Sequence, residues 1–156
     1  QLVDYGLVGD IDAIDPHVLS HLLEGGFVPV VAPLSGGVGG AIYNTNADTI
    51  AASLAAALGA EKLFFLLSVP GLLKDVAKSS SLIPHATLDE LAGFEAKGVI
   101  SGGMRPKLAA VKAALQGGVP SAHLVSGLAP DALLAEIFTN EGSGTMIVAP
   151  SVAVAG

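Results

Sequence analysis

Three polar residues, Asn44, Asn46 and Asp48, lie between a glycine-rich loop and an alanine-rich helix predicted over residues 50–58. The free N–H groups and the dipole of a helix N-terminus favour anionic ligands, and the same dipole keeps an early aspartate ionised. An ionised aspartate does not bind phosphate by itself. Asp48 is therefore typical of a residue that organises nearby lysines or a metal. The alternative is a well-capped helix without chemistry, in which Asn46 is the N-cap.

The segment VISGGMRPK, residues 99–107, places two cations at the start of another predicted helix. Its paired glycines allow the backbone to approach a ligand closely. Lys107 falls in the first turn after Pro106, where the helix dipole disfavours a positive charge, and Arg105 adds a second cation. A phosphate bound there would reverse this penalty, so the segment predicts an anion site. The alternative is a lysine side chain that extends into solvent.

Several other patterns lack the features that their chemistry requires. No Gly-Lys pair precedes Ser or Thr, which excludes a Walker A loop, and the glycines of residues 36–40 do not form a dinucleotide fingerprint because Ile42 takes the place of the last glycine. His17 and His21 lie one helical turn apart, but with no third ligand nearby they predict an exposed amphipathic helix. The remaining candidates are isolated histidines and a group of acidic residues expected at a strand edge and a cap: His85, His123, Asp10, Asp12 and Asp15.

The composition restricts the class of protein. Of the 156 residues 51% are hydrophobic and 13% charged, which excludes disorder, and the net charge of −7 argues against a nucleic-acid partner. There is no cysteine for a disulfide or a thiolate site. The longest uncharged stretch, residues 25–47, is broken by proline and glycine, and Gln1 begins no recognisable secretory leader, so we expect a cytoplasmic protein with no membrane partner. The high apolar content would also suit a chain that packs against something else.

The sequence pattern alternates between strands and helices. The predicted strands span residues 5–14, 27–34, 62–67, 121–125 and 145–148, and the predicted helices span residues 17–24, 50–58, 87–97, 106–116 and 130–138. The second strand is expected to be buried, and the third to be buried on both faces. The alternation predicts one α/β domain over residues 1–150, a three-layer α/β/α arrangement with a mostly parallel sheet, followed by a tail at 151–156. Ligands then bind at the carboxyl ends of the strands, near the loops 35–46, 68–73 and 126–130.

Four segments of the chain resemble the N-acetylglutamate kinases, which are members of the amino acid kinase family. They are NTNAD at 44–48, LLSVPGLL at 66–73, ISGGMRPK at 100–107 and EGSGT at 141–145. They occur in the order and spacing of that family, and the resemblance extends over residues 5–148. It implies the amino acid kinase (carbamate kinase-like) fold, in its C-terminal, nucleotide-binding portion only. The family's N-terminal lysine-bearing and substrate-gripping segments have no counterpart in these 156 residues, so we expect the chain to be inactive without a missing N-terminal half.

The resemblance implies transfer of the ATP γ-phosphoryl group to the side-chain carboxylate of N-acetyl-L-glutamate, in arginine biosynthesis. Lys107 would stabilise charge on the phosphoryl group and Asp48 would orient the lysines. Asn44 and Asn46 would bind the substrate. Mg²⁺ would accompany ATP without a metal site on the protein, and a homo-oligomer is expected. The residues implied for nucleotide binding, mainly through backbone groups, are Ser68, Val69, Pro70, Gly71, Leu72, Leu73, Val99, Ile100 and Ser101.

Two features separate this chain from related sequences. Ser68 stands where the family usually has aspartate, so a hydroxyl replaces a carboxylate near the nucleotide. Lysine-pathway relatives that act on an aminoadipate carrier tend to have Asp-Gly-Asp where this chain has Asn46-Ala47-Asp48, which favours the acetylglutamate enzymes. The alternatives are a catalytically inactive nucleotide-binding or regulatory module, and a kinase for another acidic amino acid such as an aminoadipate derivative.

Overall fold

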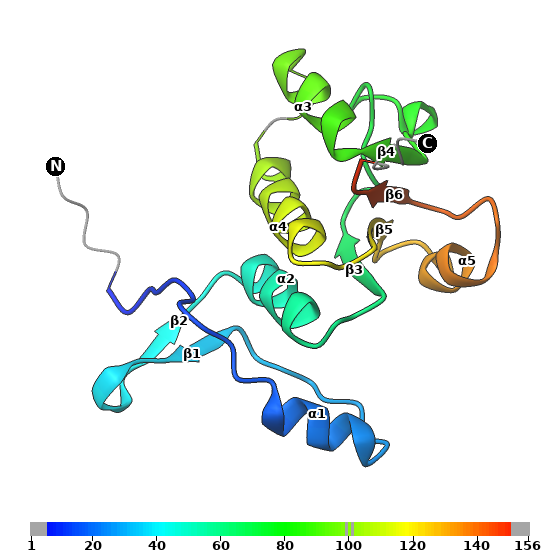
Figure 1. Ribbon diagram of the computed structural model, residues 1–156. Coiled ribbons are helices and arrows are strands. Elements are labelled where there is room, and N and C mark those ends of the chain that lie inside the picture. The colour runs from blue at the N-terminus through cyan, green and yellow to red at the C-terminus, as the bar shows by residue number, and fades with distance from the viewer. Residues whose placement is uncertain (1–5, 99, 101, 151–156) are drawn as a thin grey trace, which may run out of the picture.

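The computed structural model describes residues 6–98, 100 and 102–150. Figure 1 shows a short hairpin and a helix from the first part of the chain beside a larger sheet, which is formed by later strands. In chain order the elements are α1 His17–Glu24, β1 Leu34–Gly36, η1 Val38–Gly40, β2 Ile42–Asn44, α2 Ala47–Ala57, β3 Lys62–Leu67, η2 Ser79–Ser81, β4 His85–Thr87, α3 Leu88–Ala96, α4 Met104–Gln116, β5 Ser121–Ser126, α5 Ala132–Phe138 and β6 Thr145–Val148.

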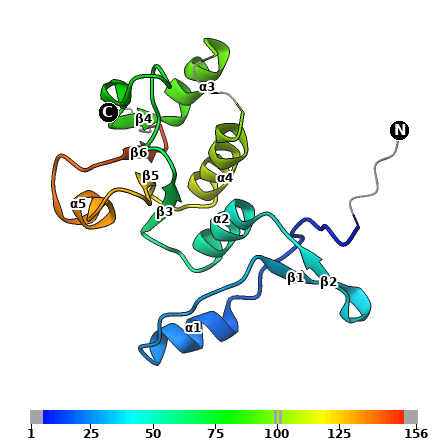
Figure 2. The same ribbon diagram turned by 180° about the vertical axis from the view of Figure 1, so that it is seen from behind.

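The four-stranded sheet has the order β3-β5-β6-β4. The β3–β5 and β4–β6 pairs are parallel, and the β5–β6 pair is antiparallel. Helices α2 and α4 lie on one face and α5 on the other, as the two opposite views agree (Figures 1 and 2). The α/β class, the layers and the mostly parallel sheet predicted from the sequence are therefore confirmed.

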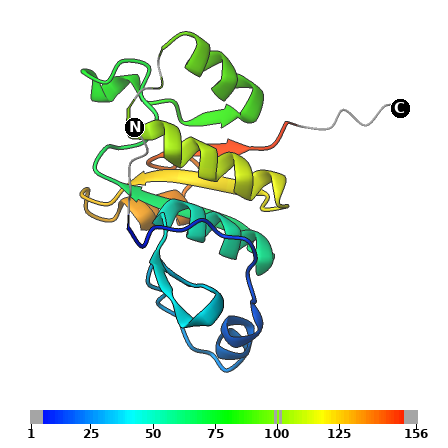
Figure 3. The same ribbon diagram turned by 90° about the vertical axis from the view of Figure 1, so that its left-hand side faces the viewer.

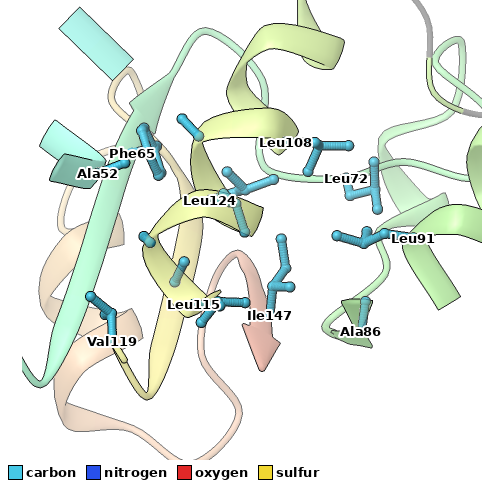
Figure 4. Packing of buried hydrophobic residues seen from close by; sticks show 14 of the residues in the cluster. Ala52, Phe65, Leu72, Ala86, Leu91, Leu108, Leu115, Val119, Leu124 and Ile147 are labelled. Atoms are coloured by element: carbon cyan, nitrogen blue, oxygen red, sulfur yellow. The ribbon is translucent and has the colours of Figure 1, made fainter. Parts of the chain in front are cut away.

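The hydrophobic core lies between α4, α3 and the sheet. Figure 4 shows Leu108 and Leu115 of α4 beside Leu124 of β5, in a cluster that also contains Ile147 of β6 and Leu91 of α3. Leu124 and Ile147 are fully buried. Because successive residues of a strand face opposite sides, Leu124 points to α4 while its neighbour His123 points to α5.

The predicted helices all form, with small shifts at their ends. α2 begins at Ala47, before the predicted start at residue 50, because Asn46 caps it: its side-chain oxygen accepts hydrogen bonds from the N–H groups of Asp48 and Thr49. In α3 Thr87 and Glu90 form the expected capping box. α4 begins at Met104, two residues before Pro106.

Two predicted strands do not form in the described residues. Residues 6–14 contain one isolated bridge, Val8 to Asn44, and the stretch from Phe27 to Pro33 pairs with no strand in the described part of the chain. This stretch is also not buried, because Val28 and Val30 are 88% and 97% exposed. A strand needs a neighbour to bond its backbone groups, and here only residues 34–36 find one, in the hairpin with β2.

The sheet also differs from expectation at β3 and β4. Leu66 of β3 is 57% exposed, so this strand is covered well on the α4 face only, contrary to the predicted burial on both faces. The three-residue strand β4, His85–Thr87, was not predicted, because it is too short to show a period and the sequence pattern assigned Thr87 to the following helix. Among the residues that the structure describes, no helix is long and apolar enough to cross a membrane. The predicted tail, residues 151–156, lies outside the described residues.

Candidate functional site

The first turns of α2 and α4 lie at the same end of the sheet. Figure 3 shows the two helices side by side over the strands, with their N-termini where the parallel strands β3 and β5 end. In a crossover between parallel strands, the connecting helix runs antiparallel to the strand that follows it. The N-terminus of such a helix therefore lies at the carboxyl end of that strand. The carboxyl edge of the sheet therefore receives two helix N-termini together with the loop that follows β3.

Lys107 and Asp48 meet at this edge. The Nζ atom of Lys107 donates to both carboxylate oxygens of Asp48, each at 3.0 Å, and the two side chains are 32% and 20% exposed. Asp48 lies in the first turn of α2, where the helix dipole favours its charge. The carboxylate also compensates Lys107 at the start of α4, where no side chain caps the helix. The two charged residues singled out by separate sequence arguments thus form one unit.

A cavity of about 420 Å³ lies beside this ion pair, at the end of β3. Its lining brings together Lys107, Ser68 and Val69, all of which the sequence analysis proposed. The residues that complete the lining are Leu66, Leu67, Gly103 and Met104. The sequence analysis did not name Gly103 and Met104 as site residues, although the paired glycines before α4 signalled a close approach of the backbone there.

Several other residues proposed for the nucleotide site are buried in the core. The side chains of Leu72, Leu73 and Ile100 are 7% exposed or less. The N–H of Leu72 donates to Thr145 Oγ1 at 2.9 Å, and its carbonyl oxygen accepts from Ile83 N at 2.8 Å. These residues thus support the loop from within. Val99 and Ser101 lie outside the described residues.

The proposed substrate residues Asn44 and Asn46 are both exposed. Asn44 is the last residue of β2. Its N–H donates to Leu7 O and its carbonyl oxygen accepts from Gly9 N, and the residue lies at the surface. The Oδ1 atom of Asn46 accepts the N–H of Asp48 at 2.9 Å and of Thr49 at 3.1 Å. Its amide nitrogen is therefore the group that Asn46 can present to a ligand.

The described part of the chain holds no group of three or more His, Asp or Glu side chains that could bind a metal ion. At the candidate site the carboxylate of Asp48 is bonded through both oxygens to Lys107. His17, which the sequence analysis placed on an exposed helix, bonds the neighbouring Asp15 through Nδ1 at 2.7 Å.

His123 is not isolated, contrary to the sequence analysis. Its Nδ1 donates to Glu136 Oε1 at 2.7 Å, and its Nε2 lies 3.1 Å from Ser121 Oγ. The other oxygen of Glu136 accepts the N–H groups of Ser143 and Gly144. Burial raises the pKa of Glu136, but the hydrogen bonds from His123, Ser143 and Gly144 outweigh it and hold the pKa below its usual value. This network attaches α5 to the loop before β6.

Comparison with known proteins identifies the family. The sequence model of the amino acid kinase family matches residues 1–126. The chain belongs to the amino acid kinase family. It is 64% identical to the acetylglutamate kinase of Myxococcus xanthus (strain DK1622) over 148 residues, which are 95% of this chain and 48% of that protein. It is 49% identical to the acetylglutamate kinase of Desulfitobacterium hafniense (strain DSM 10664 / DCB-2), over 92% of this chain and 48% of that protein. The chain thus spans about half the length of the curated relatives it matches.

Solved structures support the fold of this family member. A crystal structure of N-acetylglutamate synthase from Neisseria gonorrhoeae, complexed with coenzyme A and N-acetyl-glutamate, is 30% identical with a TM-score of 0.83, over 91% of this chain and 32% of that chain. Carbamate kinase from Giardia lamblia bound to AMP-PNP has a TM-score of 0.64 at 22% identity, over 90% of this chain and 46% of that chain. The second likeness shows the fold alone, and it agrees with the carbamate kinase-like fold expected from the sequence.

Proposed function

We propose that this chain is the nucleotide-binding part of an acetylglutamate kinase, within a longer parent protein. The parent would transfer the γ-phosphoryl group of ATP to the side-chain carboxylate of N-acetyl-L-glutamate. The observation that carries this proposal is the Lys107–Asp48 pair beside the cavity at the end of β3. The acetylglutamate kinase relatives, one of them 64% identical, support the choice of substrate.

The reaction requires little from the protein beyond alignment and compensation of charge. A glutamate-like carboxylate has a pKa near 4.3 and is ionised at neutral pH, so it attacks phosphorus without a general base. As the new O–P bond forms, the bond from the γ-phosphorus to the bridging oxygen breaks and ADP leaves. Lys107 would stabilise the charge on the transferred group, and Asp48 would hold the Lys107 ammonium in place.

The remaining residues fit roles around this centre. We propose that Ser68 and Val69, which line the cavity, contact the nucleotide, and that the backbone from Pro70 to Leu73 supports them. Ile100, with Val99 and Ser101 beside it in the sequence, would complete the adenosine side. Mg²⁺ would accompany ATP and would neutralise part of the charge of its phosphates. Asn44 and the amide nitrogen of Asn46 would donate to the amino-acid substrate.

A coupled assay on the full-length parent protein tests the proposal. Formation of acetylglutamyl phosphate, trapped as a hydroxamate, is expected with ATP and acetylglutamate, and it should exceed the rate with other acidic amino acids, including an aminoadipate derivative. Preference for another substrate would overturn the assignment of acetylglutamate. Binding of an ATP analogue by the parent in calorimetry, without turnover of any substrate in the panel, would identify the inactive nucleotide-binding module instead.

The chain 1–156 by itself should show little or no turnover. The relatives are about twice as long, and the proposed site contains a single lysine, so we expect the parent's remaining half to supply further groups. A turnover number in the range of ordinary enzymes, about 1–10³ s⁻¹, for purified 1–156 would contradict this expectation.

A further inference from the structure

Thr145 connects three segments that lie far apart in the sequence. It begins β6, is fully buried, and its hydroxyl makes two hydrogen bonds. Oγ1 donates to Ile83 O at 2.6 Å and accepts the N–H of Leu72 at 2.9 Å. Ile83 N in turn donates to Leu72 O at 2.8 Å, which closes a triangle of bonds. Both polar groups of the Leu72 backbone are thereby fixed in a region without access to water.

This triangle fixes the loop that follows β3. A Cβ atom on Gly71 would lie 2.7 Å from Thr145 Oγ1 and 2.9 Å from Leu82 Cδ1, so the loop lies directly against the start of β6 at this point. Pro70, one residue earlier, has a restricted φ angle. The distance along the chain to Val69 and Ser68 at the cavity is therefore short and stiff. A displacement of Leu72 would be transmitted to these two residues.

The position of Thr145 is itself set from the opposite face of the sheet. The carboxylate of Glu136 on α5 accepts the N–H groups of Ser143 at 2.7 Å and Gly144 at 2.8 Å. A Cβ on Gly144 would overlap the carbonyl oxygen of Leu124 in β5, so this residue can lie only where the strand leaves room. The start of β6 is consequently held on both sides before it contacts the Leu72 backbone.

We propose that Thr145 is a positioning residue for the nucleotide, acting through the Leu72 backbone on Ser68 and Val69. The proposal rests on the assignment of the cavity as part of a nucleotide site. A positioning role can be distinguished from a merely structural one. Loss of the Thr145 hydroxyl would then weaken the binding of ATP more than the binding of the amino-acid substrate. A hydroxyl at this position both donates and accepts, which valine of the same shape cannot do.

The test uses Thr145→Val and Thr145→Ser in the full-length parent protein. Thr145→Val is expected to raise the KM for ATP and the Kd of an ATP analogue by about tenfold, the effect on affinity of weakening one hydrogen bond to the nucleotide. The kcat and the KM for acetylglutamate should stay within about threefold. Thr145→Ser retains the hydroxyl and should restore ATP affinity to within about threefold of the parent. If Thr145→Val does not fold, Thr145→Cys, a weaker donor and acceptor, replaces it under the same criteria.

Ser143→Ala is the matched control. The Ser143 hydroxyl donates to Ala132 O at 2.7 Å, in the same segment, and within the described part of the chain it forms no hydrogen bond with the loop 68–73. This variant should lower the melting temperature and leave ATP affinity unchanged. Unchanged ATP affinity in folded Thr145→Val, or an equal loss in both variants, would overturn the positioning role. The unmodified parent tests the proposed function separately: absence of turnover with intact ATP-analogue binding defeats that function and leaves the Kd comparison as the test of Thr145.

Discussion

Lys107 and Asp48 compensate each other's charge, and this coupling decides what each substitution does. In the parent protein Lys107→Ala should lower kcat by about 10²–10³, or roughly 2.7–4 kcal/mol, the effect of removing one preorganised charge in a transition state. The free energy of unfolding should change by about 1 kcal/mol or less, because a partly exposed ion pair is lost while a cation leaves a helix N-terminus. Steady-state kinetics and a thermal melt of the same variant measure both effects.

Lys112 offers the control for this substitution, since it is an exposed lysine of the same helix. Lys112→Ala should leave kcat unchanged. A kcat for Lys107→Ala within about threefold of the parent would contradict the catalytic role.

Asn46 combines a structural and a proposed functional role, and two substitutions separate them. Asn46→Ala removes the N-cap of α2 and should lower the free energy of unfolding by about 1 kcal/mol. Asn46→Asp keeps the capping oxygen and should retain stability, but it lacks the amide N–H, so the KM for acetylglutamate should rise in both variants. Urea unfolding beside substrate kinetics checks this. A normal KM in Asn46→Asp would show that capping is the whole role of Asn46.

At the residue level, sequence reasoning identified Lys107 and Asp48 from the rule that a helix N-terminus favours negative charge and disfavours positive charge. Asp48 satisfies this rule and Lys107 breaks it. That signal is local, and it needs no knowledge of the partner. It could not show that the two residues bond to each other across a separation of 59 positions. It also named Leu72 as a nucleotide contact, but it could not show that the Leu72 backbone bonds Thr145 and Ile83, which lie far away in the sequence.

A buried polar network joins α5 to the loop before β6, and it depends on an ionised Glu136. The folded-state pKa of Glu136 lies below its usual value, so the unfolded chain takes up the proton first as the pH falls. The stability from this group is therefore fully present above about pH 4.3 and is lost as the pH falls further, through the folded-state pKa.

Glu136→Gln should lower the free energy of unfolding by about 2–3 kcal/mol at neutral pH, because a charged acceptor of three hydrogen bonds is replaced. The loss of stability as the pH falls below about 4.3 should also be smaller in the variant than in the parent. Denaturant unfolding at several pH values measures both. Glu95→Gln, at an exposed position of α3, is the control, and an equal pH dependence in parent and Glu136→Gln would contradict the assignment.

At the level of elements, the sequence predicted those whose own chain carries the signal. Thr87 with Glu90, and Asn46 before α2, mark helix starts by local hydrogen bonds that the structure contains. The segment from Phe27 to Pro33 has an equally clear strand composition, but a strand depends on neighbours that no local pattern specifies. The strand β4 was missed because its three residues are too few to show a hydrophobic period, although it does find a partner strand in the sheet.

At the level of the whole molecule, many large apolar side chains of the described residues are exposed. Phe27, Val28 and Val30 are exposed along one extended segment, and Leu134 and Phe138 are exposed on α5. Contiguous apolar surface and unpaired backbone favour association. We therefore expect purified 1–156 to self-associate, with a weight-average mass in sedimentation velocity that rises with concentration. A monodisperse monomer at high concentration would contradict this.

A charge within the exposed segment should reverse the association. Val30→Lys is expected to lower the associated fraction of 1–156 substantially, because a lysine at an exposed edge opposes pairing with another chain. Val76 is also exposed, at 72%, but it lies in the stretch between β3 and β4, so Val76→Lys should have little effect. The same sedimentation measurement compares the two. An equal reduction by both variants would assign the effect to net charge.

The position of β6 in the sheet determines when the sheet can be completed during synthesis of the chain. β6 is the last strand among the described residues, but it lies inside the sheet, between β5 and β4. β4 has no other partner strand in the described sheet, and about 60 residues separate the end of β4 from the start of β6. At about 5–20 residues per second, a ribosome needs roughly 3–12 s to make them. During this interval β4 and α3 lack the strand β6 against which they pack. A nascent chain that is halted before Thr145 would therefore leave β4 and α3 exposed to chaperones and proteases.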